Sequence, residues 1–98
     1  MNTQFYLLLS FNKSISNSIA KFLNKCQAET GGFGGGPGQI AHLATSYAAI
    51  NALCTLNSER ALKIINVEAL LGWIKRLKME SGAFRMHENG EEDLRYFI

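Results

Sequence analysis

Apolar residues recur at helical spacing in four stretches of the chain, and no stretch alternates apolar and polar residues as a half-buried strand does. The first stretch begins near Ser14. We predict that this helix ends in the segment 28–33, because Gly31 or Gly32 can adopt the left-handed conformation that terminates helices. Its apolar side consists of Ile15, Ile19, Phe22, Leu23 and Cys26.

Three further helices are predicted after the glycine-rich segment. One runs from about His42 to Leu56, a short one follows the N-cap Ser58 over residues 59–65, and the last follows the N-cap Asn66 over residues 67–78. Together these helices predict an all-α fold. The expected buried positions are Leu43, Tyr47, Ile50, Leu53 and Cys54 in the first of them and Leu70, Trp73, Ile74 and Leu77 in the last.

One apolar run, residues 5–11, precedes the first helix. The run is too short to cross a bilayer, and no early basic region or small-residue cleavage site marks a secretory signal. We interpret residues 1–14 as a divergent N-terminus that holds part of a preceding core helix.

Two segments of the chain resemble each other at a shift of 51 residues. The segment "IAKFLNKCQAETGGF" (19–33) aligns with "LLGWIKRLKMESGAF" (70–84), and the same shift places His42 on Asp93. A period near fifty that joins two helices through a glycine-aromatic turn is typical of helical-hairpin repeats. We expect residues 15–65 to form one repeat and residues 66–98 a second, truncated one, within a larger closed helical barrel.

The segment "GGFGGGPGQIAHLA" (31–44) contains most of the glycines and the only proline. A phosphate-binding loop is excluded, because the run lacks the required Gly-Lys-Ser/Thr ending and no strand precedes it. A flexible linker is disfavoured, because the repeat keeps Phe33 as Phe84 within the same turn. We therefore expect a structural turn in which the Phe33 ring packs inward and glycines adopt positive φ angles.

Composition narrows the functional classes further. With 47% apolar and 18% charged residues the chain is globular, and a net charge of +2 with dispersed lysines and arginines gives no basis for nucleic-acid binding. Cys26 and Cys54 lie at apolar helical positions, so we expect both to be buried and reduced, which suits a cytoplasmic protein.

Residues 26–53, "CQAETGGFGGGPGQIAHLATSYAAINAL", and 81–95, "SGAFRMHENGEEDLR", resemble the β subunits of protein farnesyltransferases. The likeness covers roughly residues 15–95, and the glycine run followed by "HLA" distinguishes them from the related geranylgeranyltransferase β subunits. The resemblance implies an α-α barrel, or toroid, that transfers farnesyl from farnesyl diphosphate to the cysteine of a C-terminal CaaX motif. It also implies a zinc ion and a prenyltransferase α subunit as partner.

Four residues match substrate-binding positions of that family. His42, Ala44, Glu91 and Arg95 correspond to positions that bind the CaaX peptide, and Arg95 also corresponds to a residue against the isoprenoid. Read without the family, His42 is better explained as a helix cap or a surface residue than as a functional one, and residues 91–93 as an acidic first turn of a helix. His87 matches a histidine of the connecting loop to which we assign no role.

The chain also departs from the family. Thr45-Ser46-Tyr47 replaces a Pro-Thr-Tyr sequence, and "YFI" (96–98) replaces two small residues and an aromatic. The family's zinc ligands, an Asp-x-Cys pair and a distant histidine, belong to later repeats, so we expect no metal ligand in this chain and no activity of the chain alone. The alternatives are a noncatalytic fragment that binds the α subunit, and another α-α toroid such as a terpene cyclase.

Overall fold

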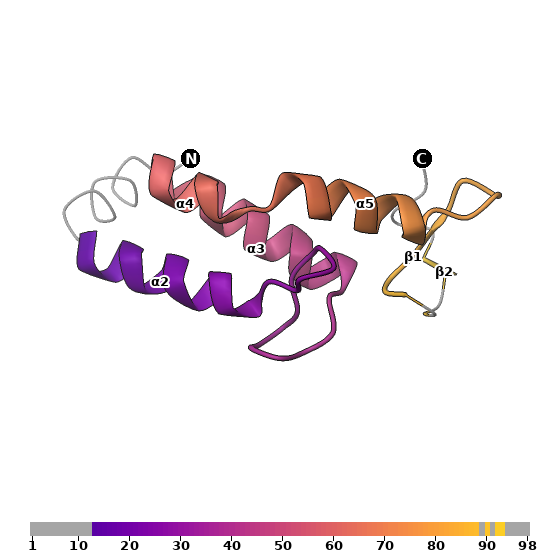
Figure 1. The fold of residues 1–98 in the computed structure, drawn as a ribbon, viewed down its shortest axis with the longest axis horizontal. Helices are drawn as coiled ribbons and strands as arrows, with labels where there is room; N and C mark the ends of the chain where they lie inside the picture. Colours follow the sequence, from indigo (N-terminus) through magenta and orange to yellow (C-terminus); the bar gives the residue numbers. More distant parts are fainter. Residues whose placement is uncertain (1–12, 89, 91, 94–98) are drawn as a thin grey trace.

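The computed structural model describes residues 13–88, 90, 92 and 93 of the chain. The described part is helical, as predicted, and the strand content is one antiparallel pair of two-residue strands in which Phe84 lies opposite Asp93. Figure 1 shows α2 and α3 side by side, with α4 and α5 above them and the strand pair beyond the end of α5. The elements are α2 (Lys13–Cys26), α3 (Leu43–Leu56), α4 (Glu59–Ile64), α5 (Val67–Leu77), β1 (Phe84–Arg85) and β2 (Glu92–Asp93).

Side chains cap the helices where the sequence predicts. The Ser58 hydroxyl accepts a hydrogen bond from the Ala61 N–H, and the Asn66 side chain accepts one from the Ala69 N–H, each at 3.1 Å. Each cap satisfies a first-turn donor that has no partner within its helix. The predicted starts of α4 and α5 are therefore confirmed.

Two apolar clusters hold the helices together. Phe33 and Leu53 are fully buried in the first cluster, where α2, α3 and α4 meet, and Trp73 and Leu77 are buried in the second, beneath α5. The predicted inward packing of Phe33 and the predicted buried side of α5 are thus confirmed. The first cluster consists of Ala20, Cys26, Phe33, Ala49, Leu53 and Ala61, and the second of Ala41, Trp73, Leu77 and Phe84.

Several predicted buried positions are wrong. Cys54 is exposed, although Cys26 is buried as expected, and both thiols are free. Tyr47 is 67% exposed, and Ile15 and Phe22 are about half exposed. In α3 the reason is that alanines and larger apolar residues surround the whole helix, so the sequence pattern defines no single buried side.

The first helix also ends earlier than predicted. α2 stops at Cys26, because Gln27 leaves the helix to form an isolated β-bridge with Phe33. Gly31 and Gly32 do have positive φ angles, of 111° and 82°, but they lie within the turn rather than at the helix end. Their conformation reverses the chain so that Phe33 returns under α2.

The turn geometry recurs 51 residues later. The bridge between Gln27 and Phe33 is repeated between Lys78 and Phe84, and Gly82 has a positive φ like Gly31. The hydrogen bond from Ala28 N–H to Gly32 O likewise recurs from Met79 N–H to Ala83 O. The two turns therefore share the β-bridge, this hydrogen bond and the positive φ of the first glycine, although Ala83 lacks the positive φ of its counterpart Gly32. The repeat boundaries at residues 15, 65 and 66 stay a prediction.

Two hydroxyl groups of α3 fix the backbone of Phe33. The buried Ser46 Oγ accepts a hydrogen bond from the Phe33 N–H at 2.8 Å, and the Thr45 Oγ1 donates one to the Phe33 carbonyl at 2.7 Å. These two residues occupy the segment in which the chain departs from the Pro-Thr-Tyr sequence. Because threonine at position 46 would also offer a hydroxyl, only the Thr45 bond to the Phe33 carbonyl is added by the departure, where Thr45 replaces a proline.

Ser46→Ala is expected to destabilise the chain by about 1–3 kcal/mol, because it leaves the buried Phe33 N–H without an acceptor. Ser18→Ala is the matched control, since the exposed Ser18 hydroxyl bonds only the Ser14 carbonyl of its own helix. Urea denaturation of both variants measures the difference. Equal stability of the two variants would contradict the role given to Ser46.

Candidate functional site

The glycine turn delivers His42 to the start of α3. The His42 N–H donates to the Phe33 carbonyl at 3.2 Å, and the next residue, Leu43, donates to the Met86 carbonyl at 2.8 Å. These two bonds join the first glycine turn, the start of α3 and the loop that follows β1. The start of α3 therefore lies against the loop that follows β1.

The His42 side chain is the N-cap of α3. Its Nδ1 accepts a hydrogen bond from the Ala44 N–H at 3.1 Å. Because a backbone N–H is always the donor, Nδ1 carries no proton in this arrangement, and the neutral ring carries its proton on Nε2. His42 therefore offers an N–H donor at Nε2. The interpretation of His42 as a helix cap is therefore correct for Nδ1. Nε2 remains available to donate a second hydrogen bond.

A second histidine lies beside the first. The ring centroids of His42 and His87 are 5.8 Å apart, with 39° between the ring planes. His87 Nδ1 is 3.0 Å from the Glu88 carbonyl oxygen, which can only accept, so this nitrogen is the donor. Sequence reasoning did not connect these residues, because they lie 45 positions apart and the repeat aligns His42 with Asp93.

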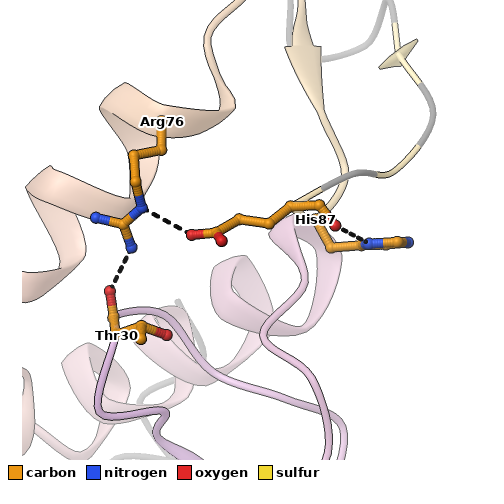
Figure 2. A network of polar contacts seen from close by, with 4 residues as sticks. Thr30, Arg76 and His87 are labelled. Carbon is orange, nitrogen blue, oxygen red and sulfur yellow. Dashed lines mark hydrogen bonds and ion pairs between the residues drawn. The ribbon is translucent and has the colours of Figure 1, made fainter.

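An ion pair holds the loop that carries His87. Arg76 of α5 contacts Glu88 through Nε at 2.7 Å and donates from Nη2 to the Thr30 carbonyl at 2.8 Å (Figure 2). Both charged side chains are about half exposed, so the pair itself adds little stability, on the order of 0.2–1 kcal/mol. Its contribution is geometric, because the Arg76 guanidinium connects Thr30 of the first glycine turn to Glu88 in the loop after β1.

The structure places two of the four predicted site residues. Ala44 lies in the first turn of α3, and its N–H forms the cap with His42. Glu91 and Arg95 lie outside the described residues. The backbone of Asp93 pairs with that of Phe84, and 51 residues earlier the backbone of His42 bonds that of Phe33. His42 and Asp93 therefore correspond in space as well as in sequence.

Within the described residues, no group of three or more histidine, cysteine or acidic side chains is placed to hold a metal ion. Two histidines alone do not complete a tetrahedral zinc site, and Nδ1 of His42 is already engaged. The described part of the chain therefore does not fit the zinc that the resemblance implies. In the same part of the chain, no helix has the length and apolar character needed to span a membrane.

Comparison with known proteins identifies relatives over most of the chain. Residues 3–98 match the prenyltransferase alpha-alpha toroid domain. Protein farnesyltransferase subunit beta of Arabidopsis thaliana is 55% identical over 82% of the chain, and that of Pisum sativum is 48% identical over 88%. The corresponding subunit of Pyricularia oryzae is 40% identical over 97%. The chain spans only 16–20% of the length of these three relatives.

Proposed function

Since the chain belongs to the prenyltransferase alpha-alpha toroid family, we propose that it forms part of the peptide-binding wall of a protein farnesyltransferase β subunit. The observation that carries the proposal is the position of His42, whose Nε2–H is left free by the cap at Nδ1. The parent enzyme transfers farnesyl from farnesyl diphosphate to the cysteine thiol of a C-terminal CaaX motif. It works in the cytoplasm together with an α subunit.

In this proposal the Nε2–H of His42 donates, through water, toward the terminal carboxylate of the peptide. Hydrogen bonds to a charged acceptor are stronger than neutral ones, which suits recognition of a chain end. The proposal also assigns Glu91 and Arg95, which lie outside the described residues, to recognition of the carboxylate, and Arg95 to the isoprenoid as well, because a guanidinium presents a planar donor surface. Ala44 lines the same wall, where its small side chain leaves room for the peptide.

The exposed apolar side of α3 supports its place within a larger toroid. Tyr47 is 67% exposed, and Ala48 and Ala52 line an open groove beside it. The groove also holds Asn51 and Thr55, but the exposed tyrosine and the alanines make this side of α3 more apolar than an ordinary solvent-facing helix surface. We infer that α3 is an inner helix and that neighbouring repeats of the complete barrel cover this side.

The chain by itself is proposed to be inactive. In this proposal zinc is held by other repeats of the complete enzyme, where it would keep the peptide thiol as a thiolate. A radiolabelled transfer assay with farnesyl diphosphate and a CaaX peptide tests this. Turnover by the isolated chain would contradict it, and a complete farnesyltransferase serves as the positive control.

A pair of peptides tests the role of His42. A fluorescent CaaX peptide with a free carboxylate is expected to bind the chain about tenfold more tightly than its C-terminal amide, because a charge-assisted hydrogen bond is lost in the amide. His42→Asn should reduce this preference but keep the fold, since asparagine is among the best N-cap residues. Fluorescence anisotropy gives both affinities. An unchanged preference in His42→Asn would overturn the assignment.

A further inference from the structure

The loop that follows β1 surrounds His87 on several sides. Its ring contacts the ring of His42, and its Nδ1 donates to the Glu88 carbonyl at 3.0 Å. Gly90 packs so closely that a Cβ at that position would lie 2.8 Å from Cε1 of His87. The His87 ring is thus confined by its own loop and lies beside the His42 ring.

The loop in turn is anchored to the rest of the molecule. Arg76 of α5 binds the Glu88 carboxylate and the Thr30 carbonyl, as Figure 2 shows. Arg85 donates from Nη1 to the Gly90 carbonyl at 3.0 Å. The position of His87 relative to His42 is therefore set by contacts from α5, β1 and both turns.

A shared metal ion does not explain the pair. The cap places the neutral proton of His42 on Nε2, so this nitrogen has no lone pair for a metal. Ligation would require loss of the cap. The cap instead leaves His42 as a hydrogen-bond donor at Nε2. The orientation of its ring then depends on the neighbouring ring of His87.

From this geometry we propose that His87 is a positioning residue for His42. Its ring blocks rotation of the His42 ring away from the Ala44 N–H, which keeps the proton on Nε2 and keeps that nitrogen accessible to an acceptor. This inference rests on the proposed function for its biological meaning, because the acceptor it serves is the peptide carboxylate. The physical claim concerns the ring orientation and the proton position of His42.

Two spectroscopic readouts on the ¹⁵N-labelled chain test the claim. The chain has only two histidines, so long-range ¹H–¹⁵N spectra are assigned by a single substitution. We expect His42 to be protonated at Nε2 and His87 at Nδ1. The amide exchange rate of Ala44 reports the cap directly, because this first-turn N–H has no acceptor within the helix.

His87→Ala is expected to speed the exchange of the Ala44 amide about fivefold, the equivalent of losing one N-cap, and to give His42 a mixture of tautomers. His87→Phe keeps a ring beside His42, so it should leave both the Ala44 exchange rate and the His42 tautomer unchanged. Gly90→Ala is a second variant that displaces the His87 ring, and it should loosen the cap as His87→Ala does. The indole signal of the buried Trp73 verifies folding.

Unchanged Ala44 exchange and unchanged His42 tautomer in both His87→Ala and Gly90→Ala would overturn the proposal, and so would a loss of both signals in His87→Phe. A CaaX peptide with a free carboxylate is then added to the wild-type chain. If the His42 signals match expectation and yet do not respond to the peptide, the proposed function fails while the positioning role stands.

Discussion

Gly31→Ala is expected to destabilise the chain by about 4 kcal/mol, through backbone strain and overpacking together. Gly31 has a φ of 111°, and a Cβ there would overlap the Ala69 carbonyl oxygen and lie 2.7 Å from the Trp73 Cβ. These atoms belong to α5, so the new methyl group cannot be accommodated without moving that helix off the turn. Urea denaturation followed by Trp73 fluorescence measures the loss.

Gly38→Ala is the matched control for this prediction. Gly38 also has a positive φ, of 78°, but no atom lies within 4 Å of the position its Cβ would take. Only the backbone strain is added, which costs about 1–2 kcal/mol. If the two variants lost the same stability, the close packing of α5 on the first turn would be contradicted.

Phe33→Ala is expected to cost about 3–5 kcal/mol, the range for removal of a fully buried aromatic side chain. Phe33 is 0% exposed and lies in the cluster that joins α2, α3 and α4. Its backbone also bonds His42, Thr45 and Ser46, so the cavity forms beneath the start of α3. The free energy of unfolding in urea measures the effect.

Phe22→Ala provides the comparison, because this side chain is 50% exposed and should lose less than about 1 kcal/mol. A smaller loss for Phe33→Ala than for Phe22→Ala would show that the glycine turn does not depend on its aromatic residue. The pair therefore tests whether the aromatic, rather than the glycines alone, holds the turn.

The sequence predicted features whose physical cause is local. Ser58 and Asn66 cap their helices because short polar side chains reach first-turn N–H groups, and α5 buries Trp73 and Leu77 because its apolar and polar sides are distinct. The repeated glycine-aromatic turn was also predictable, since Gly31 and Gly82 supply the same positive φ.

Features that depend on tertiary contact were not predictable in this way. The exposure of Cys54 and Tyr47 depends on which side of an apolar helix meets α2 and α4. The contact of His42 with His87 depends on how the second turn folds back onto the start of α3. The spacing of residues along the chain predicts neither the exposure of these two side chains nor the contact between the two histidines.

The most direct test of the central claim is a chimaeric enzyme. Residues 15–88 of this chain would replace the matching segment of the Pisum sativum farnesyltransferase β subunit, which is 48% identical over the aligned region, and the product would be co-expressed with the α subunit. We predict farnesyl transfer within about tenfold of the parent, equivalent to less than about 1.4 kcal/mol in kcat/KM. A chimaera that assembles and binds farnesyl diphosphate, but neither binds nor modifies the CaaX peptide, would contradict the account.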